Sequence, residues 1–303
     1  MLKGQIRAVL ISFLLFCVFH TSAQDLVQLK TLEDSLNALG KRSLMAKSYQ
    51  TRKEAYDKIQ SYWNKVLTIQ NNILYPFDSI KTSNILTSNN KELRIVTWML
   101  VDDEQNYVYA GYTQYLNPKT KKWEINFLAD VSAKCSNPDY GQFNHKNWYG
   151  MLYYQLIEQK KKKTVQYTLL GWDGNNRLSH KKFIEPISFT GKGEPKFGDN
   201  IFKQEKKSPR RVIFEHSAQI SMSLKYNDKD QQIVFDHLSP SESRLEGQYQ
   251  FYGPDFSYDA YKFTKGKWVY VKDILPRNDP KEEYKPKASD KKENVKMYKP
   301  KQK

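Results

Sequence analysis

Short runs of β-branched and aromatic residues, separated by turn sequences, recur along most of this 303-residue chain. Residues 164–172 form one run, residues 183–189 form another, and Asp173-Gly174 lies in the polar loop between them. An Asp-Gly pair between two such runs is a strong hairpin signal, because these residues tolerate the positive φ of a tight turn. Runs of the same kind precede and follow this pair, so residues 76–275 are expected to form an antiparallel β domain.

The pattern predicts a mainly β protein whose antiparallel meander forms a sandwich or a barrel-like sheet. With 21 Tyr, 15 Phe and 6 Trp in the chain, aromatic side chains supply much of the expected core, and they pack well on a pleated surface. A small β-propeller is the alternative architecture. Propeller blades repeat about every 40–45 residues, and the sequence shows no clear period of that length.

An N-terminal α-helical hairpin is expected over residues 24–75, ahead of the β domain. Leucines at helical spacing mark one apolar stripe on its first helix: Leu29, Leu32, Leu36 and Leu39. Asp25 can cap that helix and Gly40 can end it, which predicts a helix over residues 25–40 and a second over residues 43–72. The stripe is expected to pack against the β domain, with dimerisation as the alternative.

The first residues have the three regions of an export signal. Lys3 and Arg7 provide the positive start, an apolar run spans residues 8–19, and small residues at 21–23 form a cleavage site. The apolar run is shorter than the roughly 18 residues that a membrane span needs. Residues 1–23 are therefore predicted to be a signal peptide, with a buried strand or an uncleaved anchor as the alternatives. The mature protein would be periplasmic or extracellular.

The chain is strongly basic, with a formal net charge of +16. A basic exported protein can be attracted to acidic polymers or anionic surfaces. Nucleic acid is not expected as a partner, because export separates the protein from it and no nucleic-acid-binding motif occurs. Residues 276–303 are dominated by lysine, glutamate and proline, which predicts a disordered basic tail. Cleavage would leave Cys135 as the single cysteine, in a loop without a catalytic signature.

A near-repeat is the most suggestive local feature. Residues 212–216 (Val-Ile-Phe-Glu-His) resemble residues 233–237 (Ile-Val-Phe-Asp-His), and each run ends with an acid beside a histidine. The strand between them is expected to make the two runs next-nearest neighbours in one sheet, with their backbones about 10 Å apart. We interpret His216 and His237 as polar strand ends. The chain contains no phosphate loop, nucleophile elbow or His-Glu-x-x-His, and neither a metal nor a cofactor is predicted.

Alternating polar residues mark a second region of interest. Asp255, Ser257 and Asp259 fall on one face of an expected strand. They resemble the start of a calcium loop, but Ala260 and Gly266 occupy the positions where such a loop needs glycine and glutamate. This segment is therefore interpreted as a turn and a strand.

Six short motifs distributed over the β region form a recognisable combination. They are residues 94–98 (Arg-Ile-Val-Thr-Trp), 148–150 (Trp-Tyr-Gly), 169–174 (Leu-Leu-Gly-Trp-Asp-Gly), 197–198 (Phe-Gly), 233–238 (Ile-Val-Phe-Asp-His-Leu) and 251–259 (Phe-Tyr-Gly-Pro-Asp-Phe-Ser-Tyr-Asp). Together they resemble an uncharacterised family of exported β-rich proteins from Gram-negative bacteria, over most of residues 76–275. The family's Ser-Pro-Asp-Gly turn is Ser-Asn-Asn-Lys here, at residues 88–91. The resemblance implies export and one continuous β domain, and it implies no activity.

The sequence favours an exported, non-enzymatic envelope protein that binds a partner protein or an acidic or glycan polymer. Its binding candidates are Trp172, Asp173, Asp236, His237, Tyr252, Asp255 and Tyr258. The alternative is a glycan-acting hydrolase, which needs two carboxylates roughly 5–10 Å apart. The acids available for that chemistry are Glu185, Glu215, Asp236, Asp255 and Asp259. The sequence predicts no oligomeric state.

Overall fold

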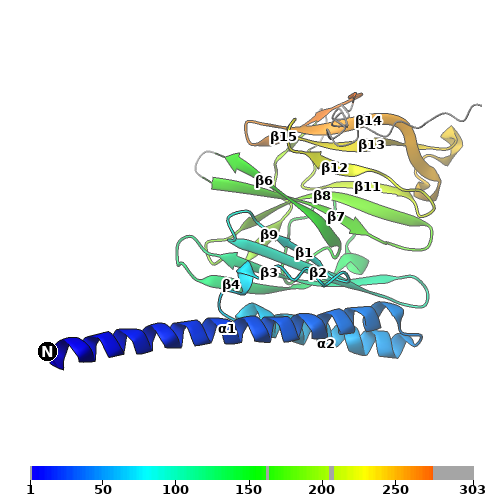
Figure 1. Cartoon of the computed structure of the whole chain (residues 1–303). Helices are drawn as coiled ribbons and strands as arrows, with labels where there is room; N and C mark the ends of the chain where they lie inside the picture. Colours follow the sequence, from blue (N-terminus) through cyan, green and yellow to red (C-terminus); the bar gives the residue numbers. More distant parts are fainter. Residues whose placement is uncertain (1, 162–163, 205–207, 276–303) are drawn as a thin grey trace, which may run out of the picture.

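The computed structural model describes residues 2–161, 164–204 and 208–275, and it consists of four stacked layers (Figure 1). A pair of helices forms the first layer, and three β-sheets follow it, which we name the first, central and outer sheets. The predicted disordered tail, residues 276–303, lies outside the described residues. The prediction of a mainly β protein with an N-terminal helical hairpin is confirmed.

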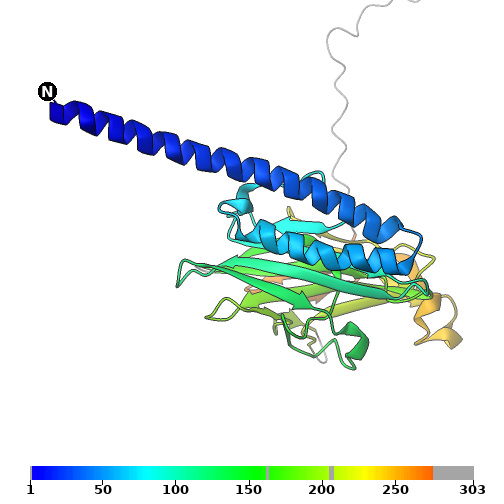
Figure 2. The ribbon, with the colours of Figure 1, turned by 90° about the horizontal axis from the view of Figure 1, so that it is seen from below.

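The helical layer consists of α1 (Leu2–Met45) and α2 (Tyr49–Thr68), which lie side by side across the first sheet (Figure 2). The N-terminal part of α1 extends beyond the sheets in both views (Figures 1 and 2). None of the described helices is long and apolar enough to cross a membrane. Removal of residues 1–23 as a signal peptide stays a prediction.

The predicted helix boundaries were wrong. Helix α1 passes through both Asp25 and Gly40 and ends only at Met45. A Cβ at Gly40 would lie 1.7 Å from Thr82 Oγ1, so glycine is needed there for a close approach, and not to end the helix. Helix α2 begins at Tyr49, because the Ser48 side chain accepts a hydrogen bond from the Thr51 backbone N–H at 3.2 Å.

The described strands form three sheets, and four short 3-10 helices also occur among the described residues. The first sheet has the order β1 (Asn84–Thr87), β2 (Leu93–Val101), β3 (Tyr107–Leu116), β4 (Trp123–Ala129). The central sheet has the order β5 (Phe143–Asn144), β9 (Pro195–Phe197), β8 (Ser179–Phe189), β7 (Thr164–Asp173), β6 (Leu152–Lys161), and β11 (Val212–Ser217) also pairs with β8. The outer sheet has the order β10 (Phe202–Lys203), β15 (Lys267–Val271), β14 (Tyr252–Thr264), β13 (Gln232–Pro240), β12 (Leu224–Asn227).

Pairing among the described strands is antiparallel, apart from the parallel contact between β10 and β15. These strands do not close into a barrel. Of the predicted architectures, the layered sandwich is therefore the one that the fold follows, although it has three sheets in place of two.

The layers are held together by three separate hydrophobic cores. The first lies between the helices and the first sheet and includes Trp63 of α2 and Trp98 of β2. The second joins the first and central sheets, and the third joins the central and outer sheets. Strand β7 contributes Leu169 to the second core and Leu170 to the third, since successive side chains point to opposite faces. Both faces of the central sheet are therefore buried.

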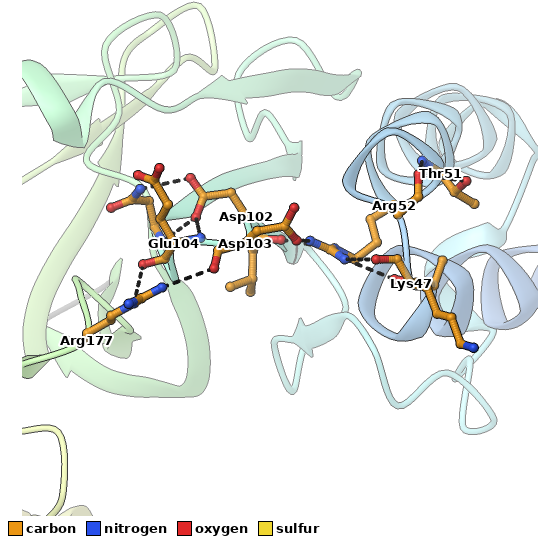
Figure 3. Close-up of polar contacts among 11 residues, drawn as sticks. Lys47, Thr51, Arg52, Asp102, Asp103, Glu104 and Arg177 are labelled. Carbon is orange, nitrogen blue, oxygen red and sulfur yellow. Dashed lines mark hydrogen bonds and ion pairs between the residues drawn. The ribbon is translucent and has the colours of Figure 1, made fainter.

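The acidic turn between β2 and β3 of the first sheet contacts the layers on both of its sides (Figure 3). Asp103 pairs with Arg52 of α2, whose guanidinium also donates to the Val101 carbonyl at 3.3 Å. From the other side, Arg177 donates to the carbonyls of Glu104 at 3.0 Å and Asp103 at 3.2 Å. The turn between β2 and β3 is thus held by arginines from the helical hairpin and from the β7–β8 connection.

Candidate functional site: a cavity against the outer sheet

The two halves of the near-repeat lie in different sheets. His216 ends β11, which pairs with β8 of the central sheet, whereas His237 lies on β13 of the outer sheet. The prediction that both occupy one sheet, with one strand between them, was therefore wrong. The sequence between them forms β12, which pairs with β13 but not with β11. The chain crosses from one layer to the next between the repeated segments.

His216 is part of the packed interior. Its direct cross-strand neighbour is His180, and the two rings meet edge to face with centroids 6.2 Å apart. Burial lowers the pKa of His216, which keeps the ring neutral, and its Nδ1 lies 2.9 Å from the Ser217 carbonyl. His216 is 2% exposed, so it lies in the interior and not at a rim.

His237, in contrast, lines a cavity of about 730 Å³ between β11 and the outer sheet. Four aromatic side chains form much of its lining: Phe214, Phe235, Tyr261 and Tyr270. Two carboxylates, Asp236 and Asp259, share the cavity with His237, and Lys203 and Lys272 add two exposed cations. A mostly apolar hollow with a few convergent polar groups is the usual form of a small-molecule site.

Asp259 is the most buried polar group of this cavity, at 1% exposure. Its Oδ2 accepts hydrogen bonds from the Tyr270 hydroxyl at 2.6 Å and from His237 Nδ1 at 2.8 Å. Its Oδ1 accepts the Asp273 backbone N–H at 3.0 Å. Burial opposes ionisation of Asp259, but these hydrogen bonds and the neighbouring His237 outweigh it, so the pKa of Asp259 lies below its ordinary value.

The ionised carboxylate of Asp259 fixes the protons of its neighbours. A carboxylate only accepts hydrogen bonds, so His237 must carry a proton on Nδ1 in order to donate to it. Burial, followed by the bond to Asp259, raises the pKa of Tyr270, which keeps that hydroxyl protonated as a donor. The His237 side chain is itself 35% exposed, so the ring held by Asp259 is accessible from the cavity.

A bulge between β13 and β14 places Asp255 beside the His237 ring. The strand register shifts between Asp236, opposite Tyr258, and Leu238, opposite Pro254. Phe256 lies within the bulge at a φ of 70°, which a non-glycine residue rarely adopts. Asp255 Oδ2 lies 4.0 Å from His237 Nε2, a separation longer than a hydrogen bond. The predicted candidates Asp236, His237 and Asp255 are thus close together in the fold.

Trp172 and Asp173 lie elsewhere, at the turn after β7. Asp173 is buried and accepts hydrogen bonds from the Tyr109 hydroxyl and the Asn175 N–H, at 2.9 and 2.8 Å. Burial raises the pKa of Asp173 despite these bonds. The Trp172 ring packs edge to face on Tyr107, 5.7 Å between centroids. These two residues fix the hairpin against the first sheet, and neither lines the cavity.

Tyr252 and Tyr258 belong to β14 but also lie outside the cavity lining. The Tyr252 hydroxyl accepts the Gly247 N–H at 2.9 Å, and its ring packs on Tyr249 at 5.2 Å. Tyr258 stands opposite Asp236 in the strand register. Of the seven predicted binding residues, Asp236 and His237 line the cavity and Asp255 lies beside His237. Tyr258 is the cross-strand partner of Asp236 outside the lining, whereas Trp172, Asp173 and Tyr252 lie elsewhere.

Two of the five acids considered for hydrolysis are committed to other contacts. Glu185 forms a fully buried ion pair with Arg211, 2.6 Å from Oε1 to Nε. Glu215 accepts the Ser179 hydroxyl at 2.5 Å. Neither lines the cavity, so Asp236 and Asp259 are the carboxylates that do. Across the described part of the chain, no three potential ligands form a metal-binding group.

Sequence reasoning missed the aromatic lining of the site. Phe214 lies on β11, distant in the chain from the β14–β15 hairpin that carries Tyr261 and Tyr270, and no local motif marks these three residues. Asp259 was considered as an acid, but its bond to His237 spans 22 positions in the chain. Comparison with protein-family models, curated proteins and solved structures finds no match to this chain.

Proposed function

We propose that this chain is an exported binding protein whose ligand, part of a glycan, occupies the cavity against the outer sheet. The observation that carries the proposal is the Asp259–His237 pair, held within an aromatic-lined hollow of about 730 Å³. Sugars offer apolar ring faces that can pack on aromatic side chains and hydroxyl groups that need acceptors. Phe214 and Tyr270 supply the first kind of contact, and the Asp236 carboxylate, beside the His237 ring, supplies the second.

Hydrolysis of the glycan is the second candidate, because Asp236 and Asp259 share one cavity. We favour binding over hydrolysis because Asp259 is held as an ionised carboxylate. Glycoside hydrolysis needs a general acid, typically a carboxyl with a raised pKa. The pKa of Asp259 is lowered, and its two oxygens already accept three hydrogen bonds. Asp236 Oδ2 accepts the Ser223 N–H at 2.6 Å, which ties it to its own sheet.

Calorimetric titration of the purified protein with a panel of envelope and environmental oligosaccharides tests the proposal. Binding of at least one oligosaccharide is expected, and replacement of the half-buried Phe214 by leucine should weaken it several-fold by removing the ring face. The matched control is Phe251→Leu, a partly exposed phenylalanine outside the cavity. Binding unaffected by Phe214→Leu would place the ligand elsewhere. Release of reducing sugar, abolished by Asp236→Asn, would support the hydrolase in place of the binding protein.

A further inference from the structure

Turns from all three sheets meet at one end of the stack, toward which the N-terminal part of α1 extends (Figure 1). The turn before β4 reaches the turn after β8, since the Asn117 side chain donates to the Gly191 carbonyl at 3.1 Å. The turn before β2 reaches β6, where Glu158 accepts the Asn89 N–H at 2.7 Å. Strand β6 contacts β12 of the outer sheet through a hydrogen bond of Gln159. We name this surface the end face, and it comprises the adjoining strand ends and the turns at residues 88–92, 117–122, 190–194, 228–231 and 265–266.

The end face is strongly basic. Its exposed lysines come from every sheet: Lys91, Lys119, Lys121, Lys122, Lys160, Lys192, Lys225, Lys262, Lys265 and Lys267. The exposed acids of the same segments are Glu92 and Asp228. Lys119, Lys121 and Lys122 share one turn, and none of these three forms an ion pair within the described part of the chain. The opposite end of the first sheet carries the acidic turn between β2 and β3, so positive potential is concentrated at the end face.

A recess of about 460 Å³ lies among these turns. Tyr115 and Phe189, whose rings stack with centroids 3.8 Å apart, line it just before the lysine-bearing turns that follow β3 and β8. Asn200 forms another part of the wall, and its carbonyl accepts a hydrogen bond from Lys267 Nζ at 2.6 Å. The recess therefore combines aromatic surface with a border of basic turns.

The polar lining of the recess is mostly uncharged. Asp199 is the carboxylate among its lining residues, and its Oδ1 lies 3.9 Å from Lys196 Nζ and 3.5 Å from the Gln142 amide nitrogen. Amide and hydroxyl side chains supply other polar groups, among them Gln166, Ser188 and Asn200. Aromatic, amide and hydroxyl groups suit a sugar ring, and the lysines around them suit acidic substituents on neighbouring sugars.

We propose that the end face binds an acidic polysaccharide, with one sugar in the recess and the acidic groups of its neighbours on the lysines of the flanking turns. This site goes beyond the function proposed for the cavity against the outer sheet, and the two share no lining residue. An anionic membrane is the other partner that a basic surface attracts. A planar membrane would contact only the protruding turns, whereas an extended polymer also fills the recess, so the observations favour the polysaccharide.

The test compares an α-1,4-linked galacturonic acid oligomer with its fully methyl-esterified form by calorimetry at pH 7. The two share backbone and length and differ in charge. The acidic oligomer should bind about tenfold or more tightly than the ester, and added salt should weaken its binding because exposed charges are screened. A glutamate oligomer with the same number of charges lacks sugar rings and should bind more weakly than the acidic sugar. Absence of binding by the acidic oligomer, or equal binding of either comparison ligand, would overturn the proposal.

A triple lysine variant tests the end face itself. Replacing Lys119, Lys121 and Lys122 with glutamine should weaken binding of the acidic oligomer about tenfold, because several exposed ion pairs are lost together. The matched control replaces exposed lysines of the helical hairpin with glutamine, at Lys41, Lys47 and Lys58. It removes the same charge and should change the affinity by less than about twofold. Equal weakening by both variants would show a general charge effect and would overturn the assignment to the end face.

Asn200→Asp tests the recess, because it adds a negative charge to the wall at an exposed position. It should weaken binding of the acidic oligomer about threefold or more, whereas Asn64→Asp, at an exposed position on α2, should not. Circular dichroism verifies that each variant is folded. Unchanged binding by Asn200→Asp would contradict a sugar in the recess.

Two further measurements separate this site from its alternatives. Sedimentation with phosphatidylglycerol vesicles that the acidic oligomer does not reverse would assign the end face to a membrane and overturn the proposal. A neutral oligosaccharide that binds in the cavity against the outer sheet should bind the triple lysine variant with unchanged affinity. Failure of the end face as a binding site is therefore distinguishable from failure of the function proposed for that cavity.

Discussion

His237 donates its Nδ1–H to the buried carboxylate of Asp259 across 2.8 Å, and this pair connects the interior of the outer sheet to an open cavity. Asp259 is 1% exposed, whereas the His237 side chain is 35% exposed. The carboxylate therefore orients a ring that lines the cavity. Because Asp259 also accepts from Tyr270 and Asp273, it should contribute to stability as well as to binding.

Replacing Asp259 with asparagine should lower the free energy of unfolding at pH 7 by about 2–3 kcal/mol. The amide nitrogen would direct hydrogens toward at least one of the donors that the carboxylate now accepts, and a buried donor would lose its partner. Urea denaturation followed by circular dichroism measures the change. Tyr270→Phe removes one of the three hydrogen bonds to Asp259 and should lower the free energy of unfolding by less, about 1 kcal/mol. An Asp259→Asn protein as stable as wild type would contradict this role.

The contribution of Asp259 should also depend on pH. Its pKa in the folded protein is below that in the unfolded chain, where it is about 3.9. The stabilisation is therefore fully present above pH 4 and is lost as the pH falls through the folded value. Asparagine does not titrate, so the stability difference between wild type and Asp259→Asn should shrink between pH 4 and more acidic conditions. A difference that is constant over this range would show that the carboxylate is not stabilised as an anion.

The contribution of Asp173 to stability should have the opposite dependence on pH. Burial raises its pKa above that in the unfolded chain, so its favourable contribution is present in acid and is lost as the pH rises through the folded value. Asp173→Asn should therefore leave the free energy of unfolding at pH 7 unchanged or raise it by up to about 1 kcal/mol. The asparagine carbonyl can still accept from Tyr109. Tyr109→Phe is the contrasting variant, because it removes the acceptor of the Gly174 N–H and should destabilise the protein.

The sequence predicted the class of the fold because strand propensity and turn residues act locally. It could not predict how the strands are distributed among three sheets, since this depends on pairing between distant segments. Leu169 and Leu170 are adjacent apolar residues, and only the stacking of layers shows that they belong to different cores. Gly40 is a similar case, because the predicted end of a helix is in fact a contact with Thr82.

Gly40→Ala should destabilise the protein by about 1–3 kcal/mol through overlap with Thr82. A loss of stability is diagnostic, because a glycine-to-alanine change at an unobstructed position inside a helix would stabilise the protein by about 1 kcal/mol. Thermal and urea denaturation provide the measurement. In a Thr82→Gly background the obstructing side chain is absent, and Gly40→Ala should become neutral or stabilising. Gly191→Ala, whose new Cβ would meet only Lys119 Nζ at 4.0 Å, serves as the control and should change stability little.

Part of the candidate site was recognisable from the sequence and part was not. Asp236, His237 and Asp255 were predicted because acids and a histidine occur near one another in the chain at strand ends. Tyr270 and Phe214 were not, because only the pairing of β14 with β15 and the stacking of β11 on the outer sheet bring them to the cavity. The near-repeat misled for the same reason, since similar strands need not share a sheet.

The buried ion pair of Glu185 and Arg211 gives a last prediction, about the central sheet. Arg211 also donates to the carbonyls of Pro138 and Gly141, so it attaches the long loop before β5 to the sheet. Arg211→Met leaves the Glu185 charge buried without its partner and should cost about 3–5 kcal/mol. The loop around Gly141 should also become sensitive to limited proteolysis under conditions in which the rest of the protein is folded.

A double variant distinguishes the cost of an unpaired buried charge from the cost of lost side-chain packing. Glu185→Leu combined with Arg211→Met removes both charges, and it should recover part of the stability lost in Arg211→Met, because no isolated charge remains buried. Loop protection should not recover, since the contacts to Pro138 and Gly141 come from Arg211 alone. Lys196→Met is the control, because its pair with Asp199 spans 3.9 Å at the surface and should contribute less than about 1 kcal/mol. A double variant no more stable than Arg211→Met would show that packing, and not the unpaired charge, determines the loss.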